Sequence, residues 1–89
     1  MAAESKLQKW CHLQLRKAGW LVVKISLTSK NGWPDTEIIR DGRTVRIEFK
    51  APGETLDPLQ IERHKQIKSR GGEVYMVNSK QKFILLKLT

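Results

Sequence analysis

Two carboxylates and a lysine in one short segment have the residue types that metal-assisted chemistry on a phosphate would need. Residues 32–53 read GWPDTEIIRDGRTVRIEFKAPG and contain Asp35, Glu48 and Lys50. The 89-residue chain has nine Asp plus Glu against 17 Lys plus Arg, so acidic residues are the scarce type. Hard divalent cations prefer carboxylate oxygens, and a neighbouring lysine can stabilise charge that develops on a phosphate. The segment is therefore a candidate site.

The turn inside this segment predicts how its residues face one another. Asp41-Gly42 is typical of a two-residue hairpin turn, and we expect strands over 35–40 and 43–51 on either side of it. Counting outward from that turn places Asp35 directly opposite Glu48. Directly opposed residues share one face of a sheet, with Cβ atoms roughly 4.5–5.5 Å apart.

The alternation of side chains along a strand then separates the site from the core. Glu48 and Lys50 point to the face that carries Asp35, while Phe49 points to the opposite face and into the core. Two opposed carboxylates repel each other and should destabilise the hairpin. A divalent cation such as Mg²⁺ between them would compensate. The alternative is a solvated strand face, neutralised by Lys50 and Arg46.

The remaining elements follow from hydrophobic spacing and from turn residues. In order, we expect a helix over 4–18, a buried strand over 20–27, a loop over 28–34, the two hairpin strands, a helix from Asp57-Pro58 to Gly71-Gly72, and a strand over 73–78. The tail over 79–89 fits a helix capped by Ser79 or an edge strand. The order α-β-β-β-α-β plus this short C-terminal element predicts a single small α/β domain over 1–89, with a mixed sheet flanked by helices.

Composition narrows the class of partner. The formal net charge is +8 and the pI is about 10.0, which favours a polyanion, usually nucleic acid. The single cysteine, Cys11, excludes an internal disulfide and fits a reducing compartment. No apolar run has the length of a bilayer span or of a signal peptide, so we expect a cytoplasmic protein without a membrane partner.

The motifs together resemble a known family. GWPD, then EFK, then AP and a helix bearing Gln60 resemble the PD-(D/E)xK nuclease superfamily, and most closely its virus-type replication-repair nuclease (VRR-NUC) branch. The resemblance covers almost the whole chain and implies a restriction-endonuclease-like fold. The D…ExK core alone is weakly specific for this family, whereas the combination of G-x-P-D, E-x-K-A-P and a downstream Gln is much more specific.

The resemblance also implies roles for individual residues. It implies phosphodiester hydrolysis with Mg²⁺ or Mn²⁺, Asp35 and Glu48 as metal ligands, and Lys50 as the catalytic lysine. It implies that the backbone carbonyl of Phe49 joins the metal ligands, and Glu4 matches the first-helix glutamate of many members. Small stand-alone members are similar to Holliday junction resolvases and act as homodimers.

Glu4 and Gln60 each have a structural alternative. Glu4 could point toward the site, or it could simply be an acidic residue in the first turn of a helix. Gln60 lies three residues after Asp57, which is the spacing of a capping box. The resemblance adds a role in support of catalysis.

Several residues are candidates for contacts with DNA. These candidates are Lys30, Trp33, Arg63, His64, Lys65 and Lys68. Arg70, Lys80 and Lys82 could add to the same positive rim. Trp33 could stack on an unpaired base or cover the edge of the core, and His64 is expected to contact phosphate or solvent.

These observations lead to an expected function with two rivals. We expect a divalent-metal-dependent DNA endonuclease that acts on branched DNA as a homodimer. The first rival is a basic nucleic-acid-binding domain without catalytic activity, which would not need a metal. The second is a monomeric nicking or flap nuclease.

Overall fold

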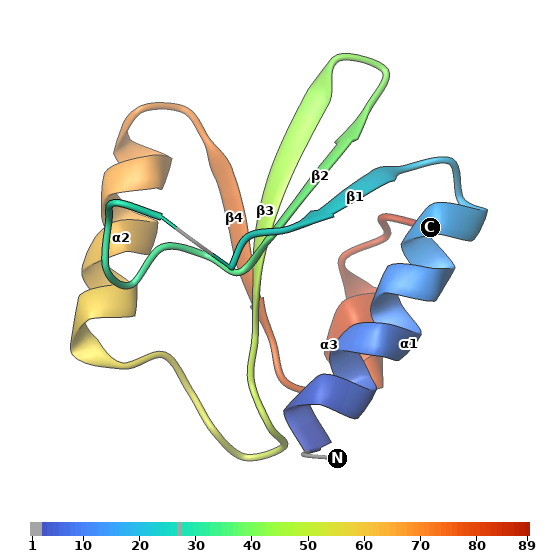
Figure 1. Ribbon diagram of the computed structural model, residues 1–89, viewed down its shortest axis with the longest axis horizontal. Helices are drawn as coiled ribbons and strands as arrows, with labels where there is room; N and C mark the ends of the chain where they lie inside the picture. The colour runs from blue at the N-terminus through green and yellow to red at the C-terminus, as the bar shows by residue number, and fades with distance from the viewer. Residues whose placement is uncertain (1–2, 27) are drawn as a thin grey trace.

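The computed structural model describes residues 3–26 and 28–89 and shows a mixed sheet between two layers of helices (Figure 1). The elements in chain order are α1 Ala3–Lys17, β1 Leu21–Lys24, β2 Thr36–Arg40, β3 Arg43–Phe49, α2 Pro58–Ser69, β4 Glu73–Val77 and α3 Lys80–Leu85. The predicted order of elements is therefore confirmed, with the tail folded as a helix.

The four strands form one sheet in the order β1-β2-β3-β4. The two pairs β1–β2 and β2–β3 are antiparallel, whereas β3 and β4 are parallel and joined through α2. The predicted mixed sheet is confirmed. α1 and α3 lie on one side of it, and α2 lies on the other side next to β4 (Figure 1).

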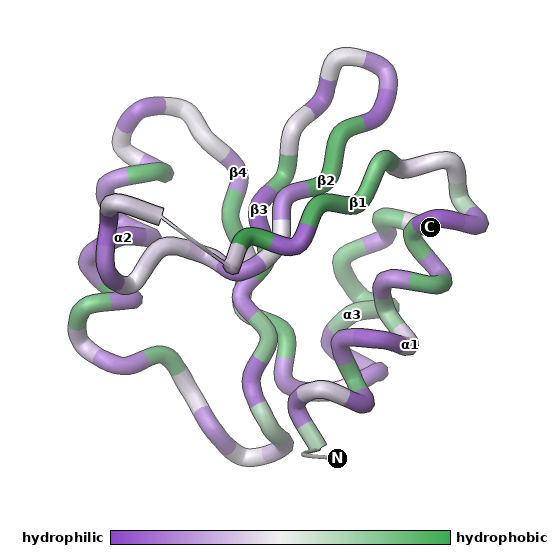
Figure 2. The backbone as a smooth tube through the Cα atoms, viewed as in Figure 1, coloured by the Kyte–Doolittle hydropathy of each residue, from purple (hydrophilic) through white to green (hydrophobic). Residues whose placement is uncertain are grey.

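The core lies between the sheet and the α1–α3 layer. Leu7, Cys11 and Leu15 follow one face of α1 and are buried against Ile47 and Phe49 of β3. Apolar residues of α1 and the strands meet on this side of the sheet (Figure 2). Burial raises the pKa of the Cys11 thiol to about 12, so this cysteine is an inert core residue.

The hairpin has the predicted turn and the predicted register. Asp41 and Gly42 both have positive φ, 50° and 78°, as a type I′ turn requires. The strands pair from Arg40 opposite Arg43 out to Thr36 opposite Ile47. One further step along this register reaches Asp35 and Glu48, so the turn sets the position of both carboxylates.

The prediction of a buried strand over 20–27 is wrong in two respects. The strand covers Leu21–Lys24, and the predicted end at Leu27 lies outside the described residues. β1 is an edge strand, and Leu21 and Val23 are 61% and 40% exposed. Only Val22 packs against the core, because α1 covers one face of β1 while α2 lies over β4 at the other end of the sheet.

The C-terminal tail forms α3, which excludes the edge-strand alternative. The Ser79 side chain accepts a hydrogen bond from the backbone N–H of Lys82 and caps the helix. Phe83 is buried, and the Trp20 indole donates a hydrogen bond of 2.7 Å to the backbone carbonyl of Leu88. These contacts hold the tail against the start of β1. Within residues 3–26 and 28–89, no helix has the length and apolar character needed to cross a bilayer.

Candidate active site

Asp35 is held at the end of a tightly packed loop. Its backbone carbonyl accepts a hydrogen bond of 2.7 Å from the N–H of Ile25, which continues the pairing of β1 with β2. Pro34 before it is fully buried. Gly32 has φ of 77°, and a Cβ there would lie 2.8 Å from Cγ of Leu59 on α2. The G-x-P-D sequence therefore fits a left-handed turn in close contact with a helix, followed by a fixed carboxylate.

Asp35 and Glu48 form a coupled pair of carboxyl groups. Glu48, on β3, is only 6% exposed. Burial and then the charge of Asp35 raise the pKa of Glu48 to about 8. Burial also raises the pKa of Asp35, against the opposing effect of hydrogen bonds from Glu48, from the backbone N–H of Phe49 and from Thr36. Because the pKa of Glu48 is raised to about 8, the metal-free pair retains a proton near neutral pH.

Lys50 and Glu4 lie close enough to act on this pair. The charge of Lys50 lowers the pKa of Glu48, whereas the charge of Glu4 raises the pKa of both Asp35 and Glu48. Lys50 directly follows β3, and its backbone N–H donates a hydrogen bond of 3.0 Å to the carbonyl of Val77. The structure thus gathers four of the predicted site residues around one place at the end of the sheet.

The distances within this group limit its role as a metal site. Among residues 3–26 and 28–89, no three His, Cys, Asp or Glu side chains approach closely enough to hold one metal ion together. Glu4 therefore influences the pair through its charge and does not form a third carboxylate ligand in this arrangement. Asp35 and Glu48 are the two side chains placed together.

A buried polar network from α1 supports Asp35, and sequence reasoning missed it. The Thr36 hydroxyl donates a hydrogen bond of 3.2 Å to Oδ1 of Asp35. Gln8 Nε2 donates to the same hydroxyl oxygen over 3.2 Å, and His12 Nε2 lies 3.0 Å from it. Because the hydroxyl proton goes to Asp35, His12 must present an N–H at Nε2.

The sequence contained a signal for the burial of Gln8 and His12, although not for their partner Thr36. Gln8 and His12 are four residues apart and each follows an apolar core position, Leu7 or Cys11, so they share the buried edge of the helix. Burial first, and then the charges of Arg16 and Lys24, lower the pKa of His12 to about 4. This histidine is neutral at pH 7.

Gln60 forms the capping box of α2. Its backbone N–H donates to Oδ1 of Asp57 over 2.8 Å, and its Oε1 accepts from the backbone N–H of Asp57 over 3.0 Å. The structural alternative for Gln60 is therefore confirmed. None of the interactions described for the carboxyl pair involves this side chain.

The position of His64 differs from the expected contact with phosphate or solvent. The side chain is 5% exposed, and Nε2 is buried without a hydrogen-bond partner among the described residues. Burial and the charge of Lys68 lower its pKa. His64 faces the sheet because it lies one turn before Ile67, the other buried residue of α2.

The other candidates for DNA contacts surround the α2 side of the sheet. Lys30, Lys65 and Lys68 are exposed. Trp33 is half-buried, with the Arg46 guanidinium 5.7 Å from its ring centroid. Arg46 also pairs with Glu37 at 3.2 Å across the hairpin.

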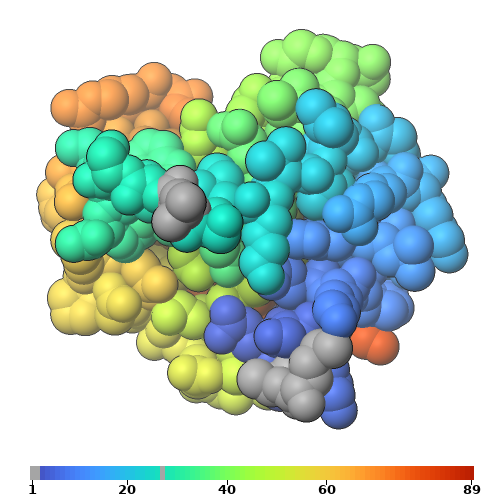
Figure 3. All heavy atoms as spheres, in the orientation of Figure 1, coloured from blue at the N-terminus to red at the C-terminus, as the bar shows by residue number. Residues whose placement is uncertain are grey.

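Arg63 has a structural role in addition to its charge. Its Nε donates to the backbone carbonyl of Asn31 over 2.8 Å, and its Nη1 donates to Oε1 of Gln66 over 3.1 Å. Arg63 thereby joins the 28–34 loop to α2. The loop and the helix lie side by side on the surface (Figure 3).

Comparisons with known proteins find similarity to this chain both in sequence and in structure. No family model matches the chain. A protein of Acyrthosiphon pisum secondary endosymbiont phage 1, named "Putative nuclease p44", is 29% identical over 77 residues, which cover 85% of this chain and 83% of the relative. A solved structure described as a "VRR_NUC domain" superposes with a TM-score of 0.89 and 27% identity, covering 98% of this chain and 96% of the other.

The fold is that of a small VRR_NUC domain, with a four-stranded mixed sheet and three helices. The structural match and the phage relative together support membership of the VRR-NUC family. The resemblance seen in the G-x-P-D and E-x-K motifs thus agrees with the whole-chain comparison.

Proposed function

We propose that the protein is a divalent-metal-dependent DNA endonuclease of the VRR-NUC type, with its active site at Asp35, Glu48 and Lys50. The observation that carries the proposal is the pair formed by buried Glu48 and half-buried Asp35, which lies beside Lys50 in a fold shared with a VRR_NUC domain. The phage relative named as a nuclease supports the same reaction class.

The residues present fit Mg²⁺ or Mn²⁺. The repulsion between buried Glu48 and half-buried Asp35 is relieved by a proton, and the two carboxylates provide hard oxygen ligands once that proton leaves. Mg²⁺ is commonly bound by one or two carboxylates together with substrate phosphate and water, so two side chains are sufficient. When bound, the ion would polarise the phosphate and lower the pKa of a water molecule.

The backbone at Phe49 supports the third ligand implied by the family. The N–H of Lys50 points to β4, where it bonds Val77, whereas the N–H of Phe49 points to Asp35. Within an extended strand the N–H and the carbonyl of one residue point to the same neighbour. The carbonyl of Phe49 is therefore proposed as a metal ligand on the Asp35 side.

The remaining residues are assigned by their positions. Lys50 is proposed to orient the attacking water or to stabilise charge on the phosphate. Glu4 is proposed to act on the pair through its charge or as a ligand in the substrate complex. Gln60 is proposed to hold the start of α2 through its capping box, as a support for catalysis.

The exposed cations are proposed to bind the DNA backbone. Lys30, Lys65 and Lys68 are exposed around α2, and the chain as a whole carries a formal net charge of +8. Phosphate contacts of this kind give affinity without sequence preference and weaken as salt increases. We propose branched DNA as the substrate and a homodimer as the working form, with one site per subunit.

The test compares cleavage of a four-way junction, a flap and a plain duplex, each with Mg²⁺ and with EDTA. The proposal requires cleavage with Mg²⁺ only, and faster cleavage of at least one branched substrate than of the duplex. Binding without hydrolysis under every condition would favour the non-catalytic rival. Junction cleavage by a monomer would favour the monomeric nuclease.

A further inference from the structure

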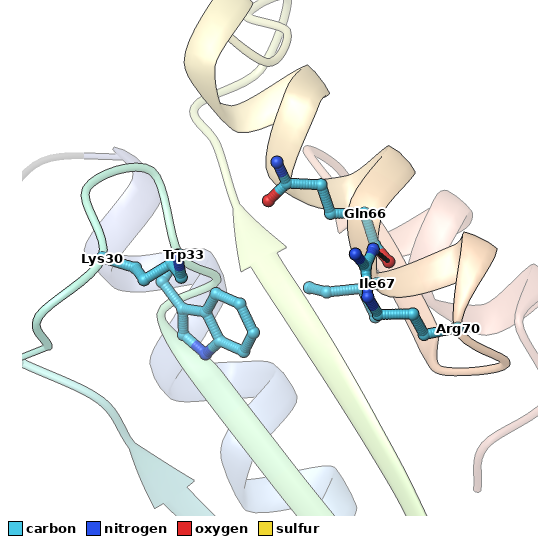
Figure 4. A pocket seen from close by; sticks show the side chains of 5 residues that line it. All are labelled: Lys30, Trp33, Gln66, Ile67 and Arg70. Carbon is cyan, nitrogen blue, oxygen red and sulfur yellow. Dashed lines mark hydrogen bonds between the residues drawn. The ribbon is translucent and has the colours of Figure 1, made fainter.

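A pocket of about 340 Å³ opens between the 28–34 loop and the second half of α2 (Figure 4). It is lined by Lys30 and Trp33 from the loop and by Gln66, Ile67 and Arg70 from the helix. Its volume is within the range of about 300–1,000 Å³ that is usual for ligand pockets. One nucleobase would fit there.

Three contacts hold the walls of this pocket in place. Arg63 on α2 bonds the backbone carbonyl of Asn31 in the loop, and Gly32 fits closely against Leu59 of the same helix. The Arg46 guanidinium lies 5.7 Å from the Trp33 ring centroid, on the sheet side of the pocket. The pocket is therefore preformed, and a ligand could bind in it without first having to order the loop.

The chemistry of the lining suits a flat, apolar group attached to phosphate. The Trp33 indole and the Ile67 side chain face each other across the space, with the Arg70 guanidinium beside them (Figure 4). Lys30 and Arg70 are both cationic, and the lining contains no acidic residue. Aromatic side chains that stack on bases, together with cations that follow the backbone, are how proteins bind single-stranded nucleic acid.

The chain positions of Trp33 and Arg46 indicate that the pocket lies near the carboxyl pair. Trp33 precedes Asp35 by two residues, and Arg46, which contacts Trp33, precedes Glu48 by two residues on the same strand face. Two residues of a strand span roughly 7 Å. A base in the pocket would therefore belong to a nucleotide close to the phosphate at Asp35 and Glu48.

We propose that this pocket binds one unpaired base of the DNA substrate beside the phosphate to be cut, an inference that rests on the proposed nuclease function. Trp33 stacks on the base, and Lys30 and Arg70 contact the phosphates that flank it. A base in a continuous duplex would first have to leave its stack and its pair, which costs free energy. DNA with an unpaired nucleotide at the cut, as in a flap, a gap or an opened junction, is therefore the preferred substrate.

Binding measured in EDTA tests this site without cleavage. The probes are a plain duplex, a duplex with a short flap, and the same flap with an abasic first unpaired nucleotide. Trp33→Ala should lower affinity for the flap about tenfold, since stacking on an aromatic side chain contributes this much or more, and should leave duplex affinity unchanged. Trp33→Phe should retain most of the preference for the flap over the duplex. The melting temperatures of Trp33→Phe and Trp33→Ala show whether the two variants are folded.

The abasic probe separates stacking from a general loss of binding. Removing the base should weaken binding to the wild type by the same factor as Trp33→Ala, and should not weaken binding to Trp33→Ala any further. Lys30→Ala should weaken flap binding more than the matched control Lys9→Ala, because Lys9 is exposed on α1 across the sheet. The proposal would be overturned if the losses of affinity caused by Trp33→Ala and by the abasic nucleotide were additive. It would also be overturned if Trp33→Ala weakened binding to the flap and to the duplex equally.

Parallel reactions with Mg²⁺ separate this inference from the proposed function. A flap preference that depends on Trp33, without cleavage by the wild type, would support the base site and reject the nuclease. Cleavage with Mg²⁺ together with equal affinity for flap, abasic flap and duplex would support the nuclease and reject the base site.

Discussion

At the scale of single residues, the carboxylates of Asp35 and Glu48 repel each other unless a proton or a cation lies between them. Glu48 is buried and Asp35 is half-buried, and the pKa of Glu48 is raised to about 8 by burial and by the charge of Asp35. In the metal-free protein a proton relieves this repulsion. A divalent cation would replace the proton, so the same two residues would weaken the metal-free fold and bind the metal.

The first prediction concerns this repulsion. Asp35→Asn should stabilise the metal-free protein, because it removes one charge while an amide oxygen can still accept from Thr36 and Phe49. Opposed like charges on a sheet cost a few tenths to about 1 kcal/mol, so the melting temperature should rise by about a few degrees. Mg²⁺ should raise the melting temperature of the wild type and have a smaller effect on the variant.

Thermal melts in EDTA and in Mg²⁺ at pH 8.5, above the raised pKa of Glu48, measure both effects. Glu62→Gln is the matched control, because Glu62 is an exposed carboxylate on α2. This variant should change neither the melting temperature in EDTA nor its response to Mg²⁺. A lower melting temperature for Asp35→Asn in EDTA, with no response of the wild type to Mg²⁺, would indicate a structural ion network and no metal site.

At the scale of elements, the turn and register of the hairpin could be predicted to the residue, the ends of its strands only to within one or two residues, and its surroundings not at all. Asp41-Gly42 restricts the turn to one geometry, and this geometry fixes the register out to Asp35 and Glu48. An apolar run such as residues 20–27 indicates a strand but not its place in the sheet, and β1 proved to be an exposed edge. Whether a strand lies at the edge or in the centre of a sheet depends on pairings between segments that are distant in the sequence.

For the polar residues of the helices, too, only local contacts could be predicted from the sequence. The capping box at Gln60 is local and was recognisable from its spacing. The burial of His64 depends on how α2 sits on the sheet, and the bonds of Gln8 and His12 to Thr36 depend on how α1 does. Such contacts join residues more than twenty positions apart, so no local pattern predicts them.

The second prediction tests the contact of α1 with the sheet through His12. An unfolded histidine has a pKa of about 6.5, whereas burial lowers the pKa of His12 to about 4. Between these values the unfolded state binds more protons, so this residue should lower the free energy of unfolding as the pH falls from 6.5 to 4. The loss should be on the order of 1–3 kcal/mol.

Urea unfolding of the wild type and of His12→Gln at pH 7 and pH 4.5 measures this contribution. The raised pKa values of Asp35 and Glu48 act in the opposite direction, adding stability as the pH falls, and the difference between the two proteins cancels them. The wild type should lose more stability than the variant. Equal losses would show that His12 is not held in its neutral form.

At the scale of the whole molecule, the chain is small and leaves an apolar edge uncovered. A domain near this size buries only about 60–65% of its unfolded surface. Leu21, Val23 and Ile39 are exposed at the β1 edge of the sheet, and an unpaired edge strand is a ready template for another chain. This edge is consistent with the proposed homodimer and suggests where the subunits would meet.

The third prediction is that the protein sediments as a dimer at micromolar concentration. Val23→Lys should shift it to a monomer, because a lysine on an edge strand opposes pairing with another edge. Lys9→Ala, on the exposed face of α1, should leave the dimer intact. A monomeric wild type that still cleaves a junction would remove the dimer from the proposal.

Metal-triggered cleavage by site variants tests the central claim most directly. With a flap or junction substrate and Mg²⁺, Asp35→Ala, Glu48→Gln and Lys50→Ala should each lower the single-turnover rate by about a hundredfold or more, since each removes a metal ligand or a charge at the reacting phosphate. Lys9→Ala should cleave at the wild-type rate, and all four should bind the DNA in EDTA with similar affinity. Cleavage near the wild-type rate by any of the three site variants would contradict the assignment of the active site.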